Sequence, residues 1–193
     1  MRTPTRNRRV EILEAAATLF AARGYHGVSI EDIGGAVGVS GPALYRHFSG
    51  KEALLAEMLT DVSTRLREAA VAVVTAAQDP AQALEALLDT QITFALEQPA
   101  LITVHDRELG NVPEPQRRQI RRLQRLYVEE WVTVLAELHP GCPPPRLRAA
   151  THAAFGLLNS TPHSAGELPP EAMREVLRAR WRARASPLLV NGS

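Results

Sequence analysis

Two helix starts that lie close together, at Ser29 and Ser40, constrain the fold of this chain more than any other feature. Ser29 precedes Ile30-Glu31-Asp32-Ile33, and a serine with a carboxylate three residues later is typical of a capping box at a helix N-terminus. Gly38 then breaks the helix, and Ser40 restarts it as an N-cap with Pro42 in the first turn. The segment therefore predicts two short helices, about 30–36 and 41–47, joined by a tight turn that contains glycine.

The rest of the chain is also divided into helix-sized pieces. Apolar residues recur every three or four positions, and prolines end one piece and begin the next. Abundant alanine and only 5% Phe, Tyr and Trp favour helices over strands. The pattern predicts an all-α fold of about nine helices, near residues 5–23, 30–36, 41–47, 51–76, 81–97, 99–109, 115–139, 146–160 and 171–185.

Charge is unevenly distributed along the chain. The total of 22 basic and 21 acidic residues gives a net charge of +1, which by itself indicates no nucleic-acid partner. Residues 1–51, however, hold seven basic and four acidic residues, a net charge of +3, which leaves −2 for the other 142. The positive charge therefore coincides with a helix-turn-helix arrangement, in which the second short helix, Gly41–His47, enters the DNA major groove.

A series of short motifs runs through about residues 9–58. The motifs are Gly24-Tyr25-His-Gly27, Ser29-Ile-Glu-Asp-Ile33, Gly38-Val-Ser40, Leu44-Tyr-Arg-His-Phe48 and Lys51-Glu-Ala-Leu54. In their order and spacing, the segment resembles the TetR/AcrR family of bacterial transcription regulators. One departure is Gly34-Gly35, where that family usually has alanine, and each glycine is expected to destabilise the helix by about 0.5 to 1 kcal/mol.

The resemblance implies which residues contact double-stranded operator DNA. A cation in the first turn of a helix opposes the macrodipole, so Lys51 suits a phosphate bound jointly by its ammonium and by backbone N–H groups. For Tyr45 and His47, packing between helices is the alternative. The predicted set comprises the phosphate-facing Ser40, Tyr45, His47 and Lys51, the base-facing Gly41, Pro42, Ala43 and Arg46, and Ser29 at the start of the preceding helix.

Arginines near the start of the chain offer a second possible DNA contact. Arg2, Arg6, Arg8 and Arg9 could form an arm that follows the minor groove, or a basic tail with no role in sequence recognition.

A DNA reader needs only about 50 residues, so the remainder requires another purpose. The resemblance implies a helix-turn-helix DNA-binding domain over 1–50 and a ligand-binding and dimerisation domain over 51–193. A homodimer would read a palindromic operator with half-sites about one helical turn, ~34 Å, apart, and an inducer would favour the conformation that releases DNA. The expected dimer seam, in the last two helices, comprises Ala153, Ala154, Gly156, Leu157, Val176, Leu177 and Trp181.

The inducer is only weakly indicated by the sequence. For each pocket candidate, ordinary core packing or a satisfied buried polar group is the alternative. A small apolar inducer is expected, and the low aromatic content argues mildly against the efflux-type pocket of a regulator that senses hydrophobic drugs. The candidates are polar or aromatic residues amid apolar helices: Phe94, His105, Tyr127, Trp131, His152, Phe155 and Asn159.

A cluster of arginines occupies one face of the helix near 115–139, with Glu114 and Glu129 near enough to offset it. It is either a solvated face with salt bridges or a docking site for a polyanion, because arginine forks suit phosphate. An anion-binding face beside an apolar pocket would fit an acyl-coenzyme A. The helix that carries this run and the segment 152–163 also resemble those of actinobacterial family members linked to fatty-acid or acyl-coenzyme A catabolism. The cluster comprises Arg117, Arg118, Arg121, Arg122 and Arg125.

Other classes of protein fit the sequence less well. An all-α enzyme could use His105, Asp106 and Glu108 as metal ligands, but Asp106 points away from the other two on a helix. No phosphate-cradling glycine loop or nucleophile elbow occurs, so we expect no enzyme activity, no cofactor and no metal. A nonspecific DNA-coating protein would show steep salt dependence without a preferred sequence.

Compartment and partners follow from a few further features. The single cysteine, Cys142, excludes an intramolecular disulfide and is expected to be an inert surface thiol in a loop. No membrane-spanning segment or signal peptide is expected, and a cytoplasmic location follows.

Overall fold

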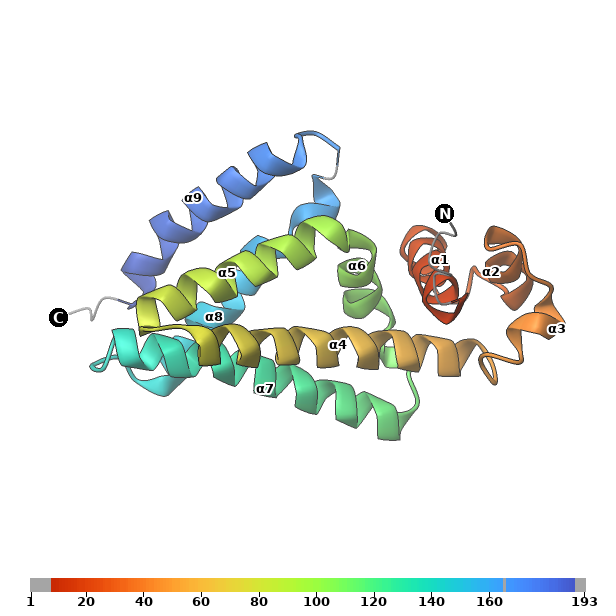
Figure 1. The fold of residues 1–193 in the computed structure, drawn as a ribbon, viewed down its shortest axis with the longest axis horizontal. Helices are drawn as coiled ribbons and strands as arrows, with labels where there is room; N and C mark the ends of the chain where they lie inside the picture. Colours follow the sequence, from red (N-terminus) through yellow and green to blue (C-terminus); the bar gives the residue numbers. More distant parts are fainter. Residues whose placement is uncertain (1–7, 165, 190–193) are drawn as a thin grey trace, which may run out of the picture. The chain divides into compact units, whose positions relative to one another are not determined.

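The computed structural model describes residues 8–164 and 166–189, and in these residues the all-α prediction is confirmed (Figure 1). Nine α-helices and two short 3₁₀ turns are present in the described residues, and no strand is. The α-helices are α1 Arg8–Arg23, α2 Ile30–Ala36, α3 Gly41–Leu44, α4 Lys51–Ala76, α5 Pro80–Glu97, α6 Pro99–Glu108, α7 Glu114–Leu138, α8 Pro144–Leu158 and α9 Pro170–Leu189; the 3₁₀ turns are Leu109–Asn111 and Thr161–His163.

The helix boundaries follow the predicted breakers closely, with one notable difference. The third helix was expected to reach residue 47, but α3 ends at Leu44. The N–H groups of Arg46 and His47 donate to the carbonyls three residues earlier, at Ala43 and Leu44, so the chain tightens into a turn there. Residues 41–47, which we call the recognition element because the sequence predicts that they enter the DNA major groove, therefore form one helical turn followed by a tighter turn.

The chain divides into two compact units, one of residues 1–62 with 100–120 and one of residues 63–99 with 121–193. The helices α4 and α7 each run from one unit into the other without a break. The predicted assignment of DNA binding to 1–50, and of ligand binding and dimerisation to 51–193, is a functional division and stays a prediction.

The first unit is held together by fully buried apolar side chains from each of its short helices. Phe20 of α1, Ile33 of α2 and Leu44 of α3 are each 0% exposed. Burying a side chain of this size stabilises the fold by roughly 1.5 to 3 kcal/mol. The apolar spacing of the sequence thus fixes α1, α2 and α3 against one another, with α1 packed on α2 and α2 on α3.

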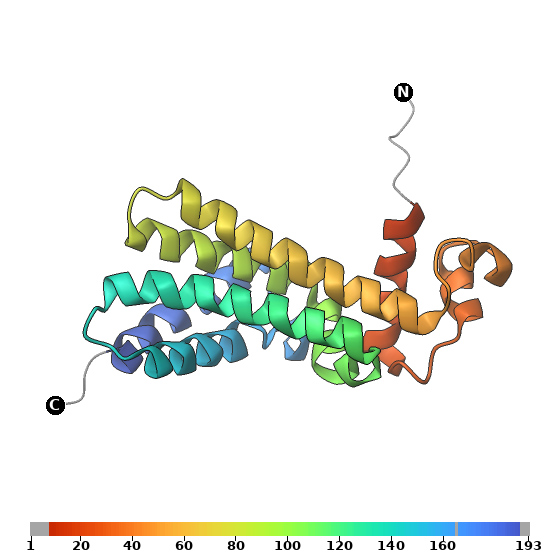
Figure 2. The ribbon, with the colours of Figure 1, turned by 90° about the horizontal axis from the view of Figure 1, so that it is seen from below.

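In the second unit, α5, α8 and α9 pack against one another. Figure 1 shows α5 and α9 running alongside each other, and Figure 2 shows α8 beside α9. Trp131 of α7 is fully buried in the same apolar cluster as Leu87 and Leu88 of α5. A ladder of polar contacts also joins α9 to α5: Arg174 donates to Thr93, Arg178 binds Asp89 and Glu85, and Arg182 binds Glu85. The four-residue spacing on both helices makes this ladder possible.

The structure also bears on the predictions for Cys142 and for membrane-spanning segments. The Cys142 thiol is free but buried, so the prediction that it is a surface thiol is wrong. Cys142 packs with Leu135 and Leu147, because its loop folds back on its own unit. In the part of the chain that the structure describes, no helix has both the length and the apolar character needed to cross a membrane.

Candidate nucleic-acid interface

The start of α2 is built by the predicted capping box. The Ser29 hydroxyl accepts from the Asp32 N–H at 3.0 Å, and the Asp32 carboxylate accepts from the Ser29 N–H at 2.8 Å. The backbone hydrogen bond from Ser29, then its hydroxyl, hold the pKa of Asp32 below its ordinary value. Arg23, 3.5 Å away, acts in the same direction.

Acid should weaken this cap. Because the folded state lowers the pKa of Asp32, its stabilising effect is complete above the ordinary value of 3.8 and is lost as pH falls through the folded pKa. We expect Asp32→Asn to lower the melting temperature at neutral pH, with a difference from wild type that shrinks below pH 3.8. Melting curves between pH 2 and 7 check this. Glu31→Gln, on the same helix, is the charge-matched control, and a constant difference across this range would contradict the expectation.

The turn between α2 and α3 depends on Gly38, whose φ of 68° lies in the left-handed region that side chains rarely adopt. Ser40 then caps α3: its hydroxyl accepts from the Ala43 N–H at 3.4 Å, with Pro42 in the first turn. The two serines and the glycine therefore have the structural roles predicted for them.

The adjacent glycines of α2 are not equivalent. A Cβ added at Gly34 would lie 2.6 Å from the Val39 carbonyl oxygen, whereas nothing lies within 4 Å of one added at Gly35. The carbonyl belongs to the turn, and the Val39 N–H also donates to the Gly34 carbonyl at 2.9 Å. The expected destabilisation relative to alanine therefore applies to Gly35. At Gly34 alanine would clash with the Val39 carbonyl, so glycine is the better fit there.

We expect Gly35→Ala to raise the free energy of unfolding by about 0.5 to 1 kcal/mol, because alanine restricts the unfolded chain and meets no obstacle in the helix. Gly34→Ala is the matched control and should not show this gain, because the Val39 carbonyl must move. Urea unfolding of both variants measures the difference. Equal gains at the two positions would refute the close approach.

The side chains of α3 and its following turn divide into a buried face and an exposed face. Leu44 and Phe48 are buried, whereas Pro42, Tyr45 and Arg46 are exposed, Tyr45 by 54%. The alternative that Tyr45 packs between helices is therefore wrong. Of the remaining predicted contacts, Ser29 and Ser40 are exposed, and Gly41, Ala43, His47 and Lys51 are half-buried.

Arg8 and Arg9 do not belong to a free arm, because both lie in the first turn of α1. Arg9 binds the Glu57 carboxylate and the His47 carbonyl, and its guanidinium stacks 4.2 Å from the centre of the Phe48 ring. Its pKa is raised by the hydrogen bond to Glu57. Arg9 thus holds the recognition element onto α4, and the expected minor-groove role is wrong for it. Arg2 and Arg6 lie outside the described residues.

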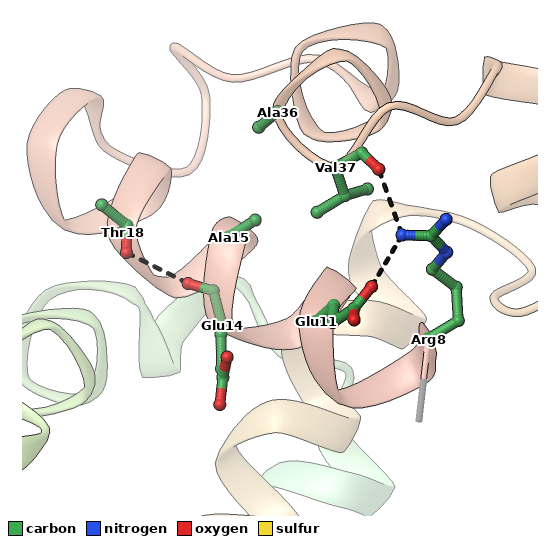
Figure 3. A pocket seen from close by; sticks show the side chains of 7 residues that line it. All are labelled: Arg8, Glu11, Glu14, Ala15, Thr18, Ala36 and Val37. Atoms are coloured by element: carbon green, nitrogen blue, oxygen red, sulfur yellow. Dashed lines mark hydrogen bonds and ion pairs between the residues drawn. The ribbon is translucent and has the colours of Figure 1, made fainter. Parts of the chain in front are cut away.

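Arg8 closes one side of an open hollow of about 440 Å³ between α1 and the end of α2 (Figure 3). Its guanidinium donates to Glu11 at 2.7 Å and to the Val37 carbonyl at 3.3 Å. It therefore also joins helices instead of extending as an arm. The lining residues are Arg8, Glu11, Glu14, Ala15, Thr18, Ala36 and Val37.

Lys51 lies at the start of α4, as predicted, but its ammonium has partners in its own unit. The Nζ atom donates to the Tyr25 carbonyl at 2.7 Å and to the Val28 carbonyl at 2.8 Å, and lies 4.3 Å from the centre of the Tyr25 ring. Burial, and then the charge of Glu52, raise the pKa of Tyr25. Two of the three N–H groups of Lys51 are thus used within the protein, and phosphate binding by Lys51 stays a prediction.

Most ligand-pocket candidates lie together in the second unit. Tyr127 stacks on Phe155, with ring centres 5.4 Å apart, and Trp131 meets Phe155 edge-on at 5.2 Å. Phe94 is half-buried on α5. His152 is exposed on α8, which contradicts its place in a pocket lining, and His105 belongs to the other unit.

A buried polar chain that the sequence analysis missed crosses this aromatic cluster. The Tyr127 hydroxyl donates to Gln91 Oε1 at 2.7 Å, and Gln91 Nε2 donates to Asn159 Oδ1 at 2.7 Å. Burial raises the pKa of Tyr127. Gln91 is 2% exposed, and its position on the apolar stripe of α5, between Leu88 and Ala95, was the available signal.

Two buried donors in the described part of the second unit have no hydrogen-bond acceptor: Trp131 Nε1 and Arg67 Nε. Unsatisfied buried donors are uncommon in native proteins, and a bound water or ligand is a usual explanation.

The arginine run of α7 is partly paired. Arg117 binds Glu114 and the Gly110 carbonyl, and Arg118 lies 3.9 Å from Glu114. Arg121, Arg122 and Arg125 are exposed in the second unit. Glu129 was expected to offset this run, which is wrong: its carboxylate binds Arg148 of α8 at 2.6 and 3.0 Å, and this hydrogen bonding lowers the pKa of Glu129 and raises that of Arg148.

The expected dimer seam is only partly available. Ala154, Leu177 and Trp181 pack into the core of their own unit, so they offer little surface to a partner. Ala153, Gly156 and Val176 are exposed and Leu157 is half-buried.

His105, Asp106 and Glu108, the metal ligands considered for an enzyme, do not come together as a metal site. His105 lies 3.4 Å from Asp106, whereas Glu108 is buried and accepts from the Tyr25 N–H and the Asn111 side chain. Across residues 8–164 and 166–189, no group of three or more His, Cys, Asp or Glu is arranged to hold a metal ion.

The fold and the exposed α3 define a helix-turn-helix protein with a larger helical C-terminal part. Residues 12–58 match the bacterial regulatory proteins of the tetR family, and residues 77–179 match the tetracyclin repressor-like C-terminal domain. The chain therefore belongs to the TetR family.

Individual relatives agree with this assignment. The transcriptional repressor KstR2 of Rhodococcus jostii is 31% identical over 133 residues, which cover 66% of this chain and 63% of KstR2, less than two thirds of that protein. The crystal structure of a TetR-family regulator from Bordetella parapertussis has a TM-score of 0.81 at 27% identity, covering 96% of this chain and 99% of that one. AibR, solved with isovaleryl coenzyme A and operator DNA, has a TM-score of 0.72 at 22% identity, covering 90% and 97%, which establishes a shared fold.

Proposed function

We propose that this protein is a ligand-responsive, DNA-binding transcriptional regulator, most simply a repressor, and not an enzyme. The observation that carries the proposal is the exposed face of α3 and the turn that follows it, where Pro42, Tyr45 and Arg46 are exposed and the buried Leu44 holds the segment in place. Membership of the TetR family supports it, as does the role of the relative KstR2 as a transcriptional repressor. A cytoplasmic location follows from contact with DNA.

The proposed DNA contacts are those predicted from the sequence. Gly41, Pro42 and Ala43 offer few hydrogen-bond groups, so base recognition would depend on apolar contacts with thymine methyl groups and on Arg46 with guanine. The proposed phosphate contacts are Ser40, Tyr45, His47 and the remaining N–H of Lys51, with Ser29 at the neighbouring helix start.

We propose that the regulator acts as a homodimer on a palindromic operator. The exposed small residues Ala153 and Gly156 of α8, with Val176 of α9, are the part of the predicted seam that remains available to a partner. Selection from a random pool of duplexes tests this directly. Enrichment of a palindrome with half-sites about one helical turn apart supports it, whereas binding without a preferred sequence indicates a nonspecific DNA-coating protein.

We further propose a small inducer with an apolar body and a hydrogen-bond acceptor, of which an acyl-coenzyme A is the leading class. The aromatic cluster of Tyr127, Trp131 and Phe155 supports an apolar site, and the unpaired Nε1 donor of Trp131, within that cluster, supports an acceptor oxygen. The complex of AibR with isovaleryl coenzyme A favours this class over the hydrophobic drugs of an efflux-type regulator.

The test is release of operator DNA in a gel-shift assay by a panel of acyl-coenzyme A thioesters, free fatty acids and hydrophobic drugs. Release by thioesters alone supports the proposed class. Release by drugs alone supports the efflux-type alternative. If no thioester releases DNA or shifts the melting temperature, the acyl-coenzyme A proposal fails.

The exposed arginines of α7 can be tested separately. If these arginines bind the phosphates of a thioester, replacing Arg121, Arg122 and Arg125 with glutamine should raise the thioester concentration needed to release operator DNA about tenfold or more. The free fatty acid concentration needed for release should not change. Arg180→Gln, at an exposed position of α9, is the control. An unchanged thioester response would assign these arginines to a solvated face.

A further inference from the structure

The loop between α1 and α2, residues 24–29, is held by side chains from two other helices of its unit. The Tyr25 N–H donates to Glu108 Oε1 of α6 at 3.1 Å. The Tyr25 carbonyl accepts from Lys51 Nζ of α4 at 2.7 Å, and the Val28 carbonyl accepts from the same atom at 2.8 Å. Both backbone polar groups of one loop residue are therefore bound, by side chains of opposite charge.

Glu108 is an unusual residue for this position. It is 8% exposed, and its second carboxylate oxygen accepts from Asn111 Nδ2 at 2.8 Å. Burying a carboxylate is unfavourable unless hydrogen bonds offset the loss of water, and an apolar side chain would fill the space without that penalty. The Glu108 carboxylate has one hydrogen bond to each oxygen, and the one from the Tyr25 N–H links α6 to the α1–α2 loop.

The loop leads directly into the recognition element. Val28, bound by Lys51, precedes Ser29, the N-cap of α2, and α2 packs on α3. The position of the Tyr25–Val28 backbone therefore sets where α2 begins, and through α2 it orients α3.

We propose that Glu108 and Lys51 are positioning residues for DNA recognition, which hold the α1–α2 loop by binding the N–H and the carbonyl of Tyr25, respectively. The proposal rests on the proposed DNA-binding function and adds to it a residue of α6, far along the chain from the helix-turn-helix. It predicts that DNA affinity depends on the hydrogen-bond acceptor at Glu108, although Glu108 itself contacts no DNA.

The first test is amide hydrogen exchange, which needs no DNA. In Glu108→Leu the Tyr25 N–H loses its acceptor, and exchange in peptides covering residues 20–30 should accelerate about tenfold or more, with peptides of the second unit unchanged. Glu108→Gln keeps an acceptor oxygen and should exchange like wild type. Unchanged exchange in Glu108→Leu would overturn the proposal. If Glu108→Leu does not fold, Lys51→Met serves as the test variant and should accelerate exchange in the same peptides. Unchanged exchange in Lys51→Met would also overturn the proposal.

The second test is affinity for a duplex selected by the wild-type protein. Glu108→Leu should bind about tenfold more weakly, and Glu108→Gln should restore affinity to about wild type. Glu167→Leu removes the same charge at an exposed site of the other unit and should have no effect. Equal loss in Glu108→Leu and Glu108→Gln would overturn the positioning role, because it would make charge the cause. If the wild type enriches no duplex, the proposed function fails, and the exchange result alone decides whether these residues hold the loop.

Discussion

Replacing Tyr45 with alanine is expected to weaken operator binding at least several-fold and to leave the free energy of unfolding within about 0.5 kcal/mol. The side chain is 54% exposed, so it contributes little to the core, and substitutions at such sites are usually close to neutral. Its proposed partner is a phosphate, whose contacts position the protein on the duplex. A gel-shift titration with a selected duplex and a urea unfolding curve measure the two quantities. Unchanged affinity would count against the proposed docking of α3.

The neighbouring residue provides the opposite control. Leu44 is 0% exposed and is the buried anchor of α3, so Leu44→Ala should lower the free energy of unfolding by about 2 to 5 kcal/mol. DNA binding should then fall in proportion to the loss of the folded helix-turn-helix. If Tyr45→Ala destabilised the protein as much as Leu44→Ala, the division of this helix into an exposed and a buried face would be wrong.

Replacing Gln91 with leucine is expected to have the largest effect in the second unit. It leaves the buried Tyr127 hydroxyl without its acceptor, and an unpaired buried group destabilises by roughly 1 to 3 kcal/mol; it also leaves the half-buried Asn159 Oδ1 without its donor. The free energy of unfolding, measured in urea, should therefore fall by at least the roughly 1 to 3 kcal/mol expected for one unpaired buried group. A loss under 0.5 kcal/mol would show that the polar chain is dispensable.

A double-mutant cycle isolates the Tyr127–Gln91 hydrogen bond. In Gln91→Leu/Tyr127→Phe neither side of this bond carries an unpaired polar group, so the double variant should be more stable than the sum of the two single losses predicts. Strict additivity would mean that the two side chains do not interact in solution.

The local structure of the candidate interface could be predicted because its signals are contained in a few adjacent residues. The cap at Ser29 needs only Asp32 three residues later, and Ser40 with Pro42 specifies the next helix start in the same way. The end of α3 could not be predicted, because the tightening after Leu44 involves backbone bonds among Ala43, Leu44 and the residues that follow. Sequence periodicity does not distinguish a helix that continues beyond its fourth residue from a tighter turn.

The roles of charged residues were harder to predict, because an ion pair depends on residues that are distant in sequence. Arg9 looked like part of a basic arm until Glu57, on α4, proved to bind it. Glu129 looked like a partner for the arginines of its own helix, and it binds Arg148 of α8 instead. Glu108 was considered as a metal ligand, and it binds a backbone N–H more than eighty residues earlier in the chain.

The sequence by itself determined the helices, the helix-turn-helix and the family, because caps, breakers and apolar spacing act within one or two turns of the chain. Tertiary structure alone decided which side chains of those helices are free to act. It exposed Tyr45 and Arg46, committed Arg9 and Lys51 to contacts within the protein, and joined Gln91 to Tyr127 and Asn159. The physical reason is that burial and hydrogen bonding depend on distances between segments, which local sequence patterns do not encode.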